Sequence, residues 1–197
     1  MAESLITKRA IADSLKELTK EKPFDKISVK DISEKCGINR QTFYYHFEDK
    51  YLLLRWIYQT DLLDKYMDDV DFDNWTEKLE LLLTAMTEDK TFYVNTITHT
   101  GTYIQEYMIV QAQNIFEQAI DYIDETLKEM DVQRESASDE QRNFIARFFA
   151  YGACGMVVEW VVKGMEEKPS YVSENMDTLK ELCEQALYDF LADRLDL

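Results

Sequence analysis

Hydrophobic positions along this chain recur mainly at intervals of three and four residues, which gathers side chains on one face of an α-helix. Only 5 Gly and 2 Pro interrupt 197 residues, and so few breakers favour long helices over a many-turned β-fold. We therefore predict an all-α protein of about nine helices. Two short helices are expected between 27 and 48, and longer ones over 4–20, 49–66, 74–86, 89–98, 102–130, 139–166 and 173–193. The buried stripe of the first is expected to hold Ile6, Ala10, Ile11, Leu15 and Leu18.

The two short helices are expected to meet at a sharp turn. Ser28 is a suitable N-cap for the first, whose apolar stripe is Val29, Ile32 and Cys36. Gly37 provides the backbone freedom that a helix C-terminus needs. Asn39 is then a suitable cap for the second helix, on which Phe43 and Phe47 lie four residues apart and are expected to point inward. The segment therefore predicts a helix–turn–helix.

The outward face of the second short helix carries no acidic residue. Its members are Arg40, Gln41, Thr42, Tyr44, Tyr45 and His46, all able to donate hydrogen bonds or to stack. A helix pair on the surface of any α-helical protein is the alternative interpretation, but it does not explain an acid-free face in so acidic a chain. We interpret this face as a DNA-reading surface, in which Arg40 and Gln41 reach base edges. Phosphate contacts are expected from Tyr44, His46 and Lys50, with Ser28 and Lys30 also at the interface.

The same residues resemble the DNA-binding segment of the TetR/AcrR family of bacterial transcription regulators. The matching positions are Ser28, Ile32-Ser33, Lys35-Cys36-Gly37-Ile38, Thr42-Phe43-Tyr44-Tyr45-His46-Phe47 and Lys50. Cys36 and Gln41 depart from the Ala and Gly common there, so the base contacts are not expected to be identical. The resemblance implies a helix–turn–helix head over 1–48, a helical regulatory and dimerisation body over 49–197, and a near-palindromic DNA operator read by a homodimer.

The net charge of −17 is unevenly distributed along the chain. Residues 1–50 sum to +1, whereas the remaining residues sum to −18. A nearly neutral head with local basic groups can approach DNA through one face, while the acidic body discourages non-specific binding. The charge therefore does not exclude a DNA-binding function.

The segment 139–166 is apolar nearly all round beyond Ile145, which indicates a helix that packs on the core and on a partner subunit. The small residues in its middle permit close helix approach. With 173–193 it is expected to form a four-helix bundle between two copies, as in TetR-like proteins. This stretch also resembles the regulators of dihydroxyacetone-kinase operons. The expected interface residues are Gly152, Gly155, Cys183, Leu187 and Phe190.

No catalytic, metal or cofactor site is expected, because the chain has only 2 His and no Gly-rich phosphate loop or Cys-x-x-Cys pair. His99 is either a simple turn residue or part of a sensing site. A pocket for a small-molecule effector is one interpretation of the aromatic and Met residues of the body, and plain core is the other. The candidate pocket residues are Tyr93, His99, Tyr103, Tyr107, Met108, Phe148, Tyr151, Met156 and Trp160.

Two regulatory hypotheses stay open for the body. In the first, a small-molecule effector changes the spacing of the two heads. In the second, the body is a protein-interaction module that recruits a co-regulator and holds no ligand. The chain shows no export signal, and its 3 Cys are widely spaced, so we expect a cytoplasmic protein with no membrane contact.

Overall fold

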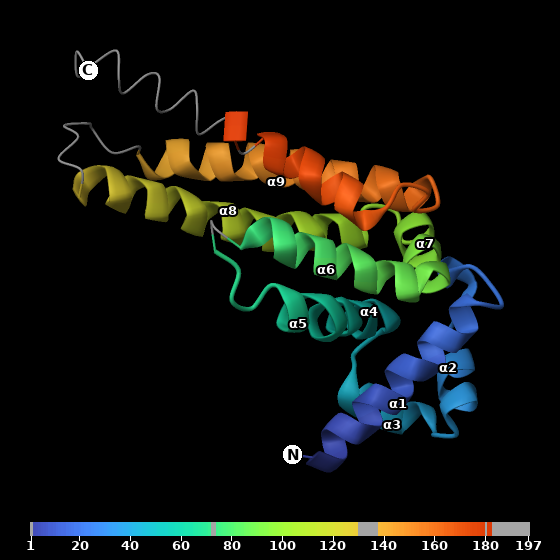
Figure 1. Cartoon of the computed structure of the whole chain (residues 1–197). Coiled ribbons are helices and arrows are strands. Elements are labelled where there is room, and N and C mark those ends of the chain that lie inside the picture. Colours follow the sequence, from blue (N-terminus) through green and yellow to red (C-terminus); the bar gives the residue numbers. More distant parts are fainter. Residues whose placement is uncertain (1, 72–73, 130–137, 180, 183–197) are drawn as a thin grey trace, which may run out of the picture.

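The computed structural model describes residues 2–71, 74–129, 138–179 and 181–182 (Figure 1). Within these ranges the regular structure is entirely helical, with no β-strand, which confirms the all-α prediction. A small head at the N-terminal end carries the helix–turn–helix. A larger body follows, in which long helices run away from the head.

The head consists of α1 (Ala2–Thr19), the short turn η1 (Phe24–Lys26), α2 (Val29–Cys36) and α3 (Arg40–His46). Their ends follow the expected local chemistry: Ser28 and Asp31 form a reciprocal capping box, Gly37 adopts φ 73°, and Asn39 accepts a hydrogen bond from the Thr42 amide. The head core holds Ile11, Leu15, Leu18, Phe24, Ile32, Phe43 and Phe47. Two members of the expected α1 stripe, Ile6 and Ala10, are instead exposed, although Ile11 and Ala12, directly after Ala10, are fully buried.

A helix between head and body was expected over 49–66, and the structure fills this range with α4 (Lys50–Tyr58), the π-helical turn η2 (Gln59–Leu63) and α5 (Asp64–Tyr66). Leu53, Leu54, Ile57 and Tyr58 are buried, so α4 packs on both sides, as its sequence indicated. The π turn was not predicted. It presents Thr60 and Asp61 to α1.

The body contains α6 (Trp75–Glu88), α7 (Lys90–His99), α8 (Tyr103–Glu129), α9 (Asp139–Val162) and a further helical segment over 169–179. Helices α8 and α9 form a long antiparallel hairpin (Figure 1). Helix α9 ends earlier than expected, because Gly164 and Met165 adopt φ of 83° and 50°. By length and composition alone α9 is also able to cross a membrane, with a third of its most apolar window buried in the chain.

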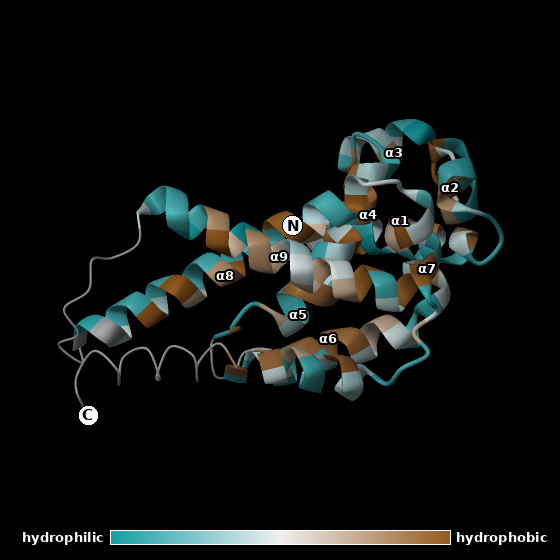
Figure 2. Cartoon of the chain, turned by 90° about the horizontal axis from the view of Figure 1, so that it is seen from above, coloured by the Kyte–Doolittle hydropathy of each residue, from teal (hydrophilic) through white to brown (hydrophobic). Residues whose placement is uncertain are grey.

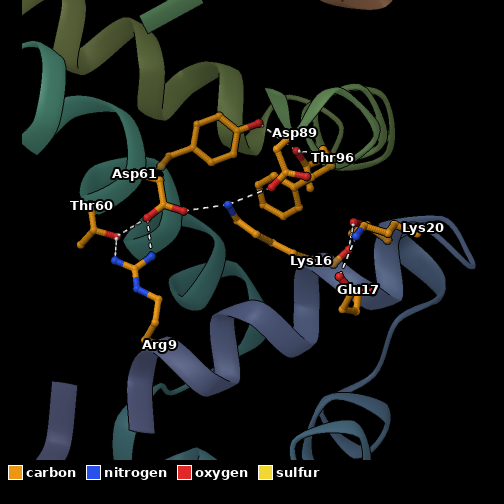
Figure 3. Close-up of polar contacts among 11 residues, drawn as sticks. Arg9, Lys16, Glu17, Lys20, Thr60, Asp61, Asp89 and Thr96 are labelled. Carbon is orange, nitrogen blue, oxygen red and sulfur yellow. Dashed lines mark hydrogen bonds and ion pairs between the residues drawn. The ribbon is translucent and has the colours of Figure 1, made fainter. Parts of the chain in front are cut away.

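A chain of alternating charges joins α1 of the head to the body (Figure 3). Asp61 of η2 accepts from Arg9, and its second oxygen lies 2.8 Å from Lys16 Nζ. Lys16 also lies 2.9 Å from Asp89, which precedes α7. Burial alone would raise the pKa of Asp61, but the hydrogen bonds from Lys16 and Arg9 outweigh it and hold that pKa below its ordinary value. The network therefore stabilises the ionised form of Asp61.

Because the pKa of Asp61 is lowered by folding, its contribution to stability is present above its unfolded pKa of about 4 and is lost as pH falls through the folded value. We expect Asp61→Asn to lower the free energy of unfolding by about 1–3 kcal/mol at pH 7. The difference from the unmodified protein should shrink below about pH 4. Urea unfolding at several pH values measures it. The exposed Asp68→Asn is the control. An equal loss in both variants, or a gap that does not shrink at all as pH falls below about 4, would contradict this role.

Candidate nucleic-acid interface

The outward face of α3 is exposed over most of its length. Arg40 and Gln41 are exposed at its N-terminal end, and Tyr44 and Tyr45 have exposed fractions of 55% and 83%. Thr42 and His46 are half-buried at the edges of this face. Within α3 itself the structure places no carboxylate, so the predicted face is present as a continuous polar and aromatic surface. Such a surface offers donors to phosphates and base edges.

Aromatic contacts fix the orientation of α3. Phe43 is fully buried, and the ring centroids of Phe43 and Phe47 lie 6.0 Å apart on the inner face. The Phe47 ring in turn lies 5.8 Å from that of Trp56 on α4, while Tyr44 stands edge-on to Phe43 at 5.7 Å. The outer face of α3 is therefore held at a defined angle to α4 rather than resting on a loose loop.

Two of the candidate DNA-contacting residues lie at the start of α2: Ser28 is its N-cap and Lys30 is in its first turn. Lys30 is exposed, and its ammonium lies 3.7 Å from Glu34, a weak surface pair that a phosphate can displace. The Ser28 hydroxyl accepts from the Asp31 amide and lies 2.8 Å from the Asp31 carboxylate. Its hydrogen bonds are therefore used inside the capping box. Lys30 is therefore the better candidate of the two for a phosphate contact.

Lys50 differs from the expectation. Its ammonium donates to the carbonyl oxygens of Phe24 at 2.8 Å, Ile27 at 2.7 Å and Asp25 at 3.3 Å, and it lies 4.6 Å from the centre of the Phe24 ring. An ammonium has three N–H donors, and all three are directed at the η1 turn. Lys50 is thus a brace between α4 and the turn that precedes α2. The sequence motif identified Lys50 as a candidate residue but did not indicate that it binds the backbone carbonyls of the η1 turn.

The candidate effector residues are not brought together. Tyr93 and Trp160 are buried in the core, whereas Phe148, Tyr151 and Met156 are exposed on the outer side of α9, and His99 is exposed at the end of α7. Tyr107 and Met108 are half-buried on α8, where Tyr107 donates to Gln59. In the part of the chain that the structure describes, these side chains therefore do not share one environment, and a pocket that combines them stays a prediction.

Tyr103, one of the candidate effector residues, lines an open hollow of about 330 Å³ between the start of α4 and the α7–α8 connection. Sequence reasoning missed the other residues of this hollow, which come from the start of α4 and from the α7–α8 connection. They are Asp49, Tyr51, Thr100, Thr102 and Glu106. The Tyr51 and Tyr103 rings meet edge-to-face with centroids 4.9 Å apart.

The expected dimer residues are only partly described. Gly152 and Gly155 lie exposed on α9, with no side-chain or backbone atom near the position a Cβ would take. Cys183, Leu187 and Phe190 lie outside the described residues. Hydrophobic residues recur along α9 (Figure 2). Those that are large and exposed are Phe144, Ile145, Phe148, Tyr151, Met156 and Val162.

The fold and the exposed recognition helix define an all-α helix–turn–helix protein. Comparison with known families is more specific. Residues 11–56 match the model of bacterial regulatory proteins of the tetR family, and residues 73–181 match that of a transcriptional regulator C-terminal region. The chain belongs to the TetR family of transcription regulators, which are not enzymes.

Two similar proteins carry related names. The chain is 29% identical, over 83% of its length and 84% of the relative's, to the HTH-type dhaKLM operon transcriptional activator DhaS of Lactococcus lactis subsp. lactis (strain IL1403). It also resembles the solved structure of a dihydroxyacetone kinase operon activator DhaS, with TM-score 0.63 and 26% identity. That alignment covers 89% of this chain and 94% of the solved one.

The placement of Lys50 changes what its removal should do. We expect Lys50→Met to lower the free energy of unfolding by about 1–3 kcal/mol, because it removes charge-assisted hydrogen bonds. The slope of log Kd against log salt for DNA binding should stay as in the unmodified protein. Lys30→Ala, by contrast, should leave stability within about 0.5 kcal/mol and reduce that slope by about 1. Urea unfolding measures the stability, and a salt titration of DNA binding measures the slope. A reduced salt slope with unchanged stability for Lys50→Met would instead show that Lys50 contacts DNA.

Proposed function

We propose that this regulator binds a near-palindromic DNA operator as a homodimer, with α3 of each copy in the major groove. The observation that carries the proposal is the exposed, acid-free face of α3 on a chain whose net charge is −17. Arg40 and Gln41 stand at the N-terminal end of the helix, where side chains of helix–turn–helix proteins reach base edges. The expected location is the cytoplasm, where operator DNA lies.

The outer side of α9 supports the dimer. Phe144, Phe148 and Tyr151 have exposed fractions of 61%, 69% and 58%, and they follow one another at helical spacing. A contiguous apolar surface of this kind normally marks an interaction site. A second copy related by a two-fold axis would cover it with the same surface. In this arrangement the apolar composition of α9 serves subunit contact rather than membrane insertion.

The regulatory input has two candidates. For a small-molecule effector, the candidate site is the open hollow beside Tyr103, where the start of α4 meets the α7–α8 connection. A protein co-regulator is favoured by a different observation: the relative in Lactococcus lactis is named an activator, and activators act through contacts with other proteins. Thermal-shift screening of metabolites separates the two, because a ligand that binds the folded chain raises its melting temperature.

The first test identifies the operator by sequencing the genomic DNA fragments that the purified protein retains. We expect fragments that share an inverted repeat. Arg40→Ala should then weaken binding to that repeat by about 1–3 kcal/mol while affecting a scrambled duplex less, because a bidentate base contact is lost. Lys65→Ala, an exposed cation on the body, is the control. Equal losses on repeat and scrambled duplexes would refute base reading by Arg40.

The dimer surface is tested by placing a charge on it. Phe148→Asp or Gly155→Glu would bury an unpaired carboxylate between the copies, which costs several kcal/mol. We expect both variants to sediment as monomers and to lose operator binding while keeping the helical signal in circular dichroism. Leu81→Asp, at an exposed apolar position on α6, should stay dimeric. A wild-type monomer at micromolar concentration that still binds the repeat tightly would overturn the dimer.

A further inference from the structure

One polar side chain of the body bonds directly to the backbone of the head. Asn95 lies on α7 and its Oδ1 accepts a hydrogen bond from the Phe24 amide at 2.8 Å. Its Nδ2 donates to the carbonyl oxygens of Thr19 at 2.7 Å and Lys22 at 3.0 Å. Both N–H groups and the oxygen of the amide are thus engaged, all with the end of α1 and the turn before α2.

The backbone groups that Asn95 binds have few other hydrogen-bond partners within their own segment. The last carbonyls of a helix have no partner within the helix, and Thr19 is the last residue of α1. Phe24 follows Pro23 and opens the η1 turn, whose carbonyls are held by Lys50 from the other side. Asn95 therefore completes the connection between α1 and α2 only when α7 lies against it.

A second attachment between head and body lies closer to the N-terminus of α1. Arg9 and Lys16 reach Asp61 and Asp89, and the Lys16 ammonium also lies 5.2 Å from the centre of the Phe92 ring on α7 (Figure 3). At 1.5 Å per residue, Arg9 and Thr19 are about 15 Å apart along α1. A single attachment would let the head turn about that point, whereas two attachments on one rigid helix fix its orientation.

We propose that Asn95 is a positioning residue for DNA binding: through Phe24 and the end of α1, it sets the angle of the head on the body. In a dimer that angle sets the separation of the two α3 helices, and hence the half-site spacing that is read. This inference rests on the proposed function, because spacing has meaning only for two heads on one operator. One added base pair moves a half-site by about 3.4 Å and turns it by about 35°, so a fixed head should reject it.

The test measures binding of the full-length protein to three duplexes that carry identical half-sites. One has the spacing found in the retained genomic fragments, and the others have one base pair more and one fewer. For Asn95→Ala we expect the preference for the natural spacing to fall by about two- to tenfold, the range that corresponds to the net free energy of one hydrogen bond. The penalty for a base substitution within a half-site should be unchanged, since α3 still reads it.

Two controls make the result specific to Asn95. Asn74→Ala removes an amide whose hydrogen bonds stay within one body loop, at Asp69 and Asp71, and it should keep the wild-type spacing preference. Asn95→Asp keeps an oxygen for the Phe24 amide but presents a carboxylate to two carbonyls, so it should behave like Asn95→Ala. Melting temperature and sedimentation confirm that each variant is a folded dimer.

The possible failures are distinguishable. A wild-type protein without a spacing optimum would overturn the proposed dimeric function, whereas an optimum that Asn95→Ala retains in full would overturn this inference alone. Equal loss of base preference and spacing preference would mean that Asn95 only keeps the head folded, and would also overturn it. Should Asn95→Ala not fold, Asp61→Asn replaces it, and a wild-type spacing preference in that variant overturns the two-point attachment.

Discussion

The attachment of α1 to the body depends on charges that lack full hydration. Asp61 has a side-chain exposed fraction of 10%, and Lys16 one of 19%. Removing such groups from water costs several kcal/mol each, which is recovered only when opposite charges meet at hydrogen-bond distance. Arg9, Lys16, Asp61 and Asp89 sum to zero charge and come from three different parts of the chain. Because this compensation holds for one placement of α1 only, the network determines how the head sits on the body.

The same logic indicates which cations of the head are available to bind DNA phosphates. Several lysines form exposed pairs within the head, for example Lys20 with Glu17 at 2.6 Å and Lys35 with Glu21 at 2.9 Å. Exposed pairs of this kind contribute at most about 1 kcal/mol, so phosphates can replace the acids at little cost. Arg9, Lys16 and Lys50 are different, because their partners hold the fold together. A basic residue near a helix–turn–helix is therefore a DNA contact only when its present partner is weak.

Local chemistry made much of the fold predictable from sequence. Ser28, Gly37 and Asn39 act at helix ends through their own neighbours, so these helix starts and stops could be inferred without tertiary structure. Lys50 and Asn95 act across long stretches of chain, and no local pattern specifies such partners. The candidate pocket residues show a related limit: aromatic residues at helical spacing look alike in the sequence whether they are buried, as Tyr93 is, or exposed, as Phe148 is. Hydrophobic periodicity defines a face but not what covers it.

The two sides of α9 show how the body divides its hydrophobic residues. The buried positions Ala146, Ala150 and Cys154 are small and follow each other at intervals of four, in the part of the helix that pairs with α8. Small side chains let two helices approach closely but bury little apolar area. The large residues Phe144, Phe148 and Tyr151 are on the outer side, where each is more than half exposed. A helix optimised for a single chain would have the reverse arrangement. The proposed second copy is the partner that gives this arrangement a physical reason, because it converts exposed aromatic area into buried area.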